Sequence, residues 1–169
     1  MKLSLRGRWG NIQMIFVAVF LLAVLLAVSF IDAKTLRIPN WLTAILFVSG
    51  LVMLARSDVM TIALHLGSSA AIYLLTVGLS YAYRRLRGVN GLGLGDAKLL
   101  ASFAVWVGPL WLAPIVFLAS SLAIIFVLFR RLLAGAALSK VIPFGPFLSA
   151  AFFASWCAKT FGLAALRVL

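Results

Sequence analysis

Acidic residues are nearly absent from this sequence, which holds three aspartates and no glutamate against 15 lysines and arginines. Cysteine and histidine each occur once, as Cys157 and His65. A single cysteine excludes an intramolecular disulfide, and one cysteine with one histidine cannot build a nitrogen and sulfur metal site. We therefore expect neither a bound metal nor a cofactor.

Charged residues of either sign make up only 11% of the chain, whereas 65% of it is hydrophobic. This balance lies outside the range of soluble globular proteins. The apolar runs approach the roughly 20 residues that a membrane helix needs, and they lack the alternation of barrel strands. We expect an all-α integral membrane protein. Its basic residues separate the apolar runs instead of forming one patch, so membrane lipid is an expected partner and nucleic acid is not.

About six transmembrane helices are expected, forming one domain over residues 1–169. The first apolar run extends to Ile31, longer than the core of a signal peptide, so a retained anchor is expected. Gly108 and Pro109 supply a turn within a run that is too long for one span. The predicted spans cover residues 12–31, 41–55, 59–83, about 91–107, 110–129 and 143–158.

Six spans place the loops at residues 32–40, 84–98 and 130–140 on one side of the membrane. These loops carry about nine of the 15 basic residues, and the other side carries about six. The positive-inside rule therefore predicts that these loops face the cytoplasm, with both termini outside.

Two of the three carboxylates occur in the same tripeptide, Asp-Ala-Lys, at Asp32 and Asp96. Asp32 closes the first predicted span and Asp96 opens the fourth, so both lie on the same side. Neighbouring carboxylates share a proton, and such a pair can activate water while polarising a peptide carbonyl. The helix dipole favours the anion of Asp96 and disfavours that of Asp32, which predicts Asp96 as the base. Helix capping and proton relay remain alternatives for the two residues.

Other polar residues near these aspartates have plainer explanations as well. Lys34 and Lys98 either contact a substrate or fix the depth of the helices by reaching the headgroups. Gly93 and Gly95 permit either flexibility or close approach of another backbone beside Asp96. Away from them, Asp58 is expected to cap the third span and His65 to donate a packing hydrogen bond.

Four segments in this order resemble the motif set of the type IV prepilin peptidases, namely residues 30–32, 38–40, 93–98 and 143–146. The resemblance covers nearly the whole chain. Members of that family are membrane aspartic proteases of the GxGD type, which remove a short basic leader from prepilins and pseudopilins at the cytoplasmic face. The resemblance implies the same activity in a bacterial inner membrane, in type IV pilus biogenesis and protein secretion.

Carried over by position, the resemblance makes Asp32 and Asp96 the catalytic pair. It implies substrate-binding or site-supporting roles for Gly93, Gly95, Lys34, Lys98, Pro143, Gly145 and Pro146. Larger family members add a cytoplasmic domain with paired cysteine motifs and methylate the new N-terminus. Because this sequence has one cysteine, we expect a compact form with peptidase activity only, similar to those that serve Flp/Tad-type pili.

Three other functions fit parts of the sequence. An archaeal-type preflagellin peptidase would use the same mechanism on another substrate. A proton-coupled carrier or a nonenzymatic pilus-assembly subunit would use the carboxylates as relay points or as structural groups. A relay needs further ionisable residues across the membrane, and beyond the two aspartates there is little but His65, Thr76 and several serines. The sequence indicates no oligomeric state.

Overall fold

The computed structural model describes residues 2–88, 93–134 and 142–162, and these residues form six α-helices and no strand. The all-α prediction and the number of helices are confirmed. In chain order the helices are α1 (Lys2–Thr35), α2 (Asn40–Leu54), α3 (Val59–Arg87), α4 (Leu94–Val107), α5 (Pro109–Ala134) and α6 (Gly145–Cys157), and a short π-helical turn, Ala158–Gly162, follows α6.

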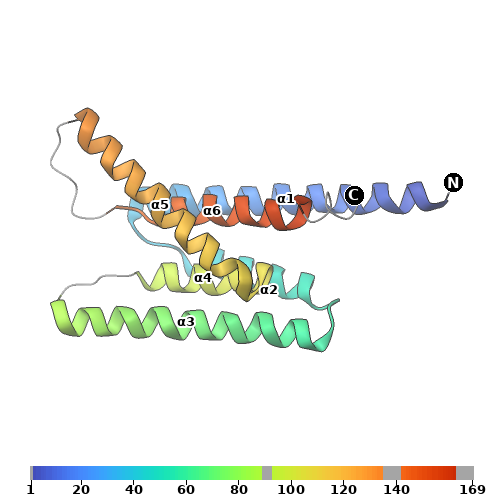
Figure 1. The fold of residues 1–169 in the computed structure, drawn as a ribbon, viewed down its shortest axis with the longest axis horizontal. Helices are drawn as coiled ribbons and strands as arrows, with labels where there is room; N and C mark the ends of the chain where they lie inside the picture. The colour runs from blue at the N-terminus through green and yellow to red at the C-terminus, as the bar shows by residue number, and fades with distance from the viewer. Residues whose placement is uncertain (1, 89–92, 135–141, 163–169) are drawn as a thin grey trace.

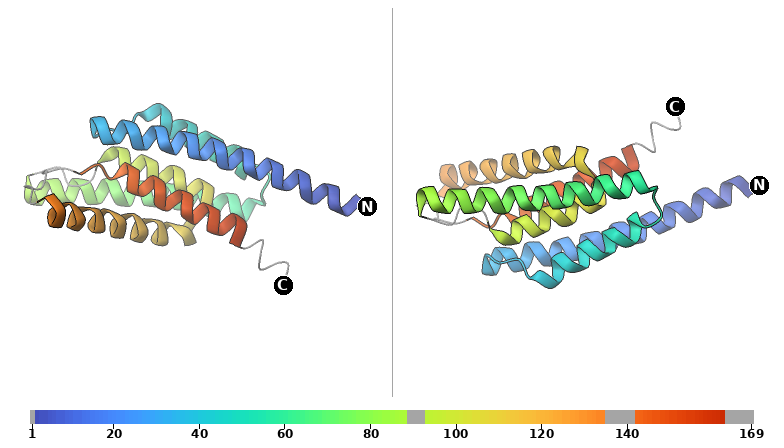
Figure 2. Two further views of the ribbon diagram at one scale, coloured as in Figure 1. Left: turned by 90° about the horizontal axis from the view of Figure 1, so that it is seen from above. Right: turned by 90° about the horizontal axis from the view of Figure 1, so that it is seen from below.

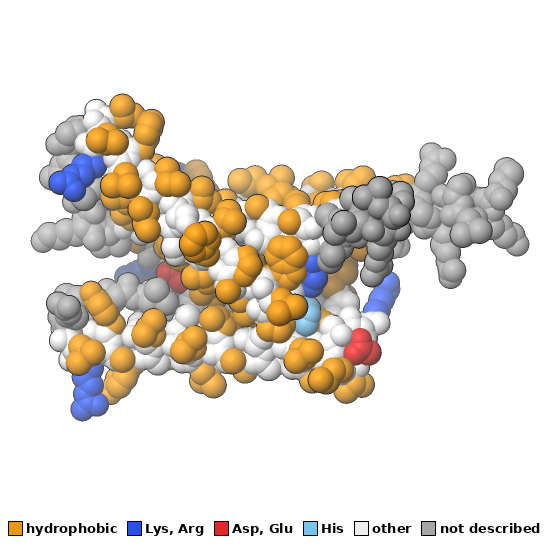
Figure 3. All heavy atoms as spheres, in the orientation of Figure 1, with side chains coloured by type: hydrophobic (Ala, Val, Ile, Leu, Met, Phe, Trp, Pro, Cys, Tyr) orange, Lys and Arg blue, Asp and Glu red, His pale blue; other side chains and the backbone are white. Residues whose placement is uncertain are grey.

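Three of the helices are long and apolar enough to cross a membrane, at Ile12–Thr35, Val59–Leu86 and Pro109–Leu133. Apolar side chains cover the middle of the molecule, and basic side chains lie toward its two ends (Figure 3). Pro114 lies inside α5 without ending it, which membrane helices tolerate. The predicted start of the fourth span near residue 91 lies outside the described residues, and α4 begins at Leu94.

The ends of the helices agree with local sequence signals. α1 ends where Leu36 adopts a left-handed conformation (φ 54°), and its amide bonds the carbonyl of Asp32 at 2.8 Å. Pro39 then precedes the first residue of α2. Asp58 caps α3 as predicted, because its carboxylate accepts hydrogen bonds from the amide and the hydroxyl of Thr61 at 2.9 and 2.8 Å.

The core is built around α4 and α6, the two shortest helices. Nine of the 14 residues of α4 are buried. α2 and α3 pack against α4, whereas α1 and α5 pack against α6, as Figure 1 and the two views of Figure 2 show. The rings of Phe103 in α4 and Phe152 in α6 stack with centroids 3.9 Å apart and join the two groups.

The ends of α1, α3 and α5 lie at the same end of the bundle as the starts of α2, α4 and α6 (Figure 1). The end of α1 and the starts of α2, α4 and α6 therefore lie close together there. This arrangement confirms that Asp32, in the last turns of α1, and Asp96, in the first turn of α4, belong to the same end of the molecule.

Candidate active site

Asp32 is held against the start of α6. Its side chain is only 5% exposed, and its Oδ2 accepts a hydrogen bond from the Gly145 amide at 2.8 Å. A Cβ atom at position 145 would lie 2.7 Å from this oxygen, so glycine is what allows the backbone to approach the carboxylate. A hydrogen bond of this kind stabilises the ionised form of a carboxyl group.

Two glycines bring Asp96 to the same place. The amide of Gly93 hydrogen-bonds the carboxylate of Asp96, and a Cβ atom at position 93 would lie 3.1 Å from its Oδ2. A Cβ atom at position 95 would lie 3.1 Å from the Cβ of Ile38. Gly95 therefore lets α4 begin against the loop that leaves α1, which keeps Asp96 near the end of the helix that carries Asp32.

The two carboxylates interact electrostatically. Burial, and next to it the negative charge of Asp32, raise the pKa of Asp96 to about 6, while the hydrogen bond from Gly93 opposes the rise. Moving the pKa from its ordinary value of 3.8 to about 6 corresponds to about 3 kcal/mol in favour of the protonated form.

The roles expected from the helix ends, with Asp96 as the base, stay a prediction, and burial and the charge of Asp32 act against the Asp96 anion. A helix N-terminus stabilises an anion by about 0.3–1 kcal/mol, less than burial and repulsion cost here. The dipole was visible in the sequence, whereas the burial of Asp96 and the amide that reaches Asp32 depend on the tertiary fold.

The two lysines of the tripeptides differ in position. Lys34 is exposed, and its amine lies 4.1 Å from the ring centroid of Phe30, one turn away on the same helix. Lys98 is half-buried, and its amine donates to Asn40 Oδ1 at 2.8 Å, which ties α4 to α2. Lys98 is thus part of the packing beside the aspartates, and Lys34 is directed to the surface of α1.

The motif at the start of α6 borders a second feature. Pro143 is half-buried just before α6, and Pro146, at its second residue, lines a cavity of about 400 Å³ between α1 and α6. Ser149 also lines this cavity, and its buried hydroxyl has no hydrogen-bond partner among the described residues. Nothing in the sequence singled out Ser149, because its isolation is a property of the tertiary packing.

The opposite end of α4 has its own polar contacts. His65 Nδ1 lies 2.8 Å from the carbonyl of Val105, which confirms its predicted role as a packing hydrogen bonder. Lys159, which the sequence did not single out, donates to the carbonyl of Val107 at 2.8 Å. These partners satisfy carbonyls that the end of a helix leaves free. In the part of the chain that the structure describes, no three histidine, cysteine, aspartate or glutamate side chains are grouped as metal ligands.

Comparison with known proteins agrees with the motifs. The family model described as the type IV leader peptidase family matches residues 19–128, a segment that includes Asp32 and Asp96. A prepilin leader peptidase/N-methyltransferase of Aeromonas salmonicida is 36% identical over 162 residues, which are 95% of this chain and 53% of the relative. The leader peptidase HopD of Escherichia coli is 38% identical over 130 residues, with 72% of this chain and 79% of the relative covered.

The chain spans about half the length of the Aeromonas relatives that it matches. A prepilin leader peptidase/N-methyltransferase of Dichelobacter nodosus is 32% identical over 139 residues, which again cover 46% of that relative. No solved structure matches the chain at a significant level. With a family match over most of its length and both aspartates within it, this chain belongs to the type IV leader peptidase family.

Proposed function

We propose that this protein is a membrane aspartic endopeptidase that removes the basic leader peptide from prepilins or pseudopilins. The observation that carries the proposal is the pair of carboxylates, Asp32 and Asp96, held at one end of the bundle by Gly145 and Gly93. The names of the relatives supply the class of substrate. The basic loops beside the pair support a cytoplasmic active site in the bacterial inner membrane.

The proposed mechanism gives each aspartate one task. The Asp32 carboxylate, stabilised by the Gly145 amide, removes a proton from water, and the oxygen attacks the scissile carbonyl carbon. Asp96, which holds a proton at pH values below its raised pKa of about 6, donates that proton to the carbonyl oxygen as the tetrahedral intermediate forms. Asp32 then passes its proton to the leaving nitrogen while the C–N bond breaks, and Asp96 recovers a proton from the intermediate.

We place the peptide beside the start of α6. The cavity between α1 and α6 adjoins Gly145 through Pro146, and the Ser149 hydroxyl in it can donate to a peptide carbonyl. Its apolar lining suits a side chain next to the scissile bond. Pro143, Gly145 and Pro146 thus act as site-supporting residues, and Lys98 supports the site through Asn40. We propose only the peptidase activity for these 169 residues.

Cleavage by the purified protein in lipid bilayers tests this proposal. A panel of prepilins, pseudopilins and preflagellins is incubated with the wild type, Asp32→Asn and Asp96→Asn, and released leader is measured. We expect each variant to lose at least about 10³-fold in rate on prepilins, as expected for loss of a general acid or base.

Asp58→Asn is the matched control, because it removes the third carboxylate at the other end of the bundle and keeps full activity. Full cleavage by either Asp32→Asn or Asp96→Asn would refute the assignment. Cleavage of preflagellins but not of prepilins or pseudopilins would show that the protein is an archaeal-type preflagellin peptidase.

A further inference from the structure

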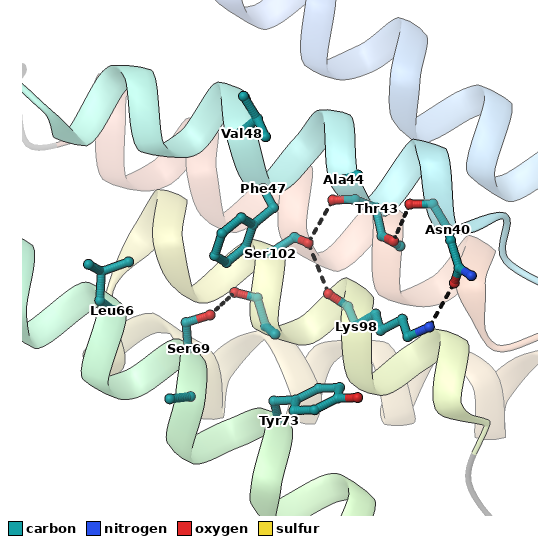
Figure 4. A pocket seen from close by; sticks show the side chains of 12 residues that line it. Asn40, Thr43, Ala44, Phe47, Val48, Leu66, Ser69, Tyr73, Lys98 and Ser102 are labelled. Carbon is teal, nitrogen blue, oxygen red and sulfur yellow. Dashed lines mark hydrogen bonds between the residues drawn. The ribbon is translucent and has the colours of Figure 1, made fainter.

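An open groove lies between α2 and α3, and its lining shares no residue with the α1 and α6 cavity. Its volume is about 470 Å³. The floor is α4, where Ala101 and Ser102 are small, and the walls are α2 and α3, which both pack on α4 (Figure 4). Val48 and Leu66, both exposed, lie at one end of the walls. The groove is therefore open toward the membrane.

The other end of the groove is polar. Lys98 lies between Asn40 on one wall and Tyr73 on the other, and the Tyr73 hydroxyl points toward the same end (Figure 4). The Lys98 amine donates to Asn40 and forms no ion pair with any carboxylate in the described ranges. A cation without a counter-ion at the mouth of an apolar groove is complementary to an amphiphile with a negatively charged head.

The dimensions separate two possible occupants. Asn40 and Val48 lie eight residues apart on α2, so the groove runs about 12 Å from its polar end, close to the roughly 15 Å depth of one hydrocarbon leaflet. A helix about 10 Å across and four turns long occupies on the order of 1,700 Å³, several times the volume of the groove. The groove is too small for a helix and of a suitable size for an acyl chain.

We propose that the groove binds an anionic phospholipid of the leaflet on the active-site side. One acyl chain lies between α2 and α3 over Ala101 and Ser102, and the phosphate lies at Lys98 with Tyr73 beside it. Basic pockets between membrane helices are a known class of site for anionic headgroups. The lipid fills the space between α2 and α3. Its phosphate binds α4 through Lys98, which lies two positions after Asp96.

Lipid binding is measured by native mass spectrometry on the purified full chain, titrated with phosphatidylglycerol or with phosphatidylcholine. The wild type is expected to prefer phosphatidylglycerol. Lys98→Gln is expected to weaken phosphatidylglycerol about fivefold, the equivalent of about 1 kcal/mol, and to leave phosphatidylcholine unchanged. Lys98→Arg should retain the preference. Lys34→Gln is the matched control, because it removes a lysine outside the groove.

A second set of variants tests the acyl chain. Ala70→Phe fills the groove from α3 and should weaken both lipids, whereas Ala71→Phe, on the neighbouring exposed position that does not line the groove, should weaken neither. Ala44→Phe fills it from α2 and serves if Ala70→Phe does not fold. The binding measurement does not depend on catalysis. Repeating it on Asp96→Asn therefore tests lipid binding separately from the proposed peptidase activity.

Two results would overturn the proposal. One is an unchanged preference for phosphatidylglycerol in Lys98→Gln. The other is normal binding of both lipids to a folded groove-filling variant. Prepilin can also be crosslinked to the wild type and to that same variant. If the variant binds both lipids normally but no longer crosslinks to prepilin, the groove binds the peptide instead.

Discussion

The polar groups at the two ends of α4 have opposite kinds of neighbour. At the C-terminal end, His65 and Lys159 each reach a backbone carbonyl that the helix leaves free, at 2.8 Å in both cases. At the N-terminal end, burial and next to it the charge of a second carboxylate, Asp32, raise the pKa of Asp96. The first arrangement pairs donors with acceptors, whereas the second places two acids together.

This difference separates structural groups from functional ones. A buried polar group that finds its partner stabilises the fold modestly, but two acids that repel each other oppose folding. Nothing in the packing of α4 requires an acid at position 96, since the Gly93 amide that it binds stands at an exposed helix end. Burial, and next to it the charge of Asp32, raise the pKa of Asp96 to about 6, and the proton that Asp96 holds below that pH is what the proposed reaction uses.

Apart from the removal of either aspartate, the largest effect is expected at the contact between α6 and Asp32. In Gly145→Ala the new Cβ would lie 2.7 Å from Asp32 Oδ2, so the carboxylate and the helix start must separate. We expect kcat/KM for prepilin cleavage to fall about 10²-fold, the usual consequence of a misplacement near 1 Å. Gly67→Ala, in α3 with nothing near the new Cβ, should keep full activity. Equal activity in the two variants would show that the Gly145 contact is not needed for catalysis.

The next largest effect is expected at the C-terminal end of α4, where loss of a hydrogen bond should lower the free energy of unfolding. Lys159→Met removes the donor to the Val107 carbonyl, whose loss as a charged hydrogen bond costs about 1–3 kcal/mol. Burial also lowers the pKa of Lys159, so part of this cost is regained when the ammonium group is removed.

Unfolding in detergent measures the loss, and Lys34→Met at an exposed site should leave stability unchanged. Activity per folded molecule should stay near the wild-type value in Lys159→Met. A tenfold loss of kcat in Lys159→Met would mean that the two ends of α4 are coupled.

The sequence predicted the six helices, the common end of Asp32 and Asp96, and the separate role of Asp58. Those predictions depend on apolar run length, on counting crossings and on capping rules, all of which are local. It did not predict the hydrogen bond from the Gly145 amide to Asp32, because the two residues lie 113 positions apart in the chain. Lys159 and Ser149 were missed for the same reason, since their roles are defined by α4 and α1.

The pH dependence of cleavage sharpens the comparison at the acidic end. With Asp96 as the acid, kcat/KM should fall as the pH rises through about 6, because the proton that the reaction needs is then lost. Asp32→Asn removes the negative charge that helps to raise this pKa, so the pKa of Asp96 should move below about 6.

Since Asp32→Asn is expected to be inactive, infrared absorption of the protonated carboxyl group follows the titration. Asp58→Asn provides the control and should leave the pKa of Asp96 unchanged. An unchanged titration in Asp32→Asn would mean that the two carboxylates do not interact.

The smallest effect is expected at Asp58, the one carboxylate with a purely structural role. Hydrogen bonds from the Thr61 amide and hydroxyl lower its pKa, so folding favours its anion. Its contribution is full above the unfolded value of about 3.9 and is lost as the pH falls through the lowered value in the folded state.

Asp58→Ala should therefore lower the melting temperature by a few degrees at pH 7 and by less in acid. Cleavage should be unaffected at every pH where the protein is folded. A shift of the pH profile in Asp58→Ala would connect the carboxylate at the structural end to the acids at the other, and the two ends of the bundle could no longer be treated as independent.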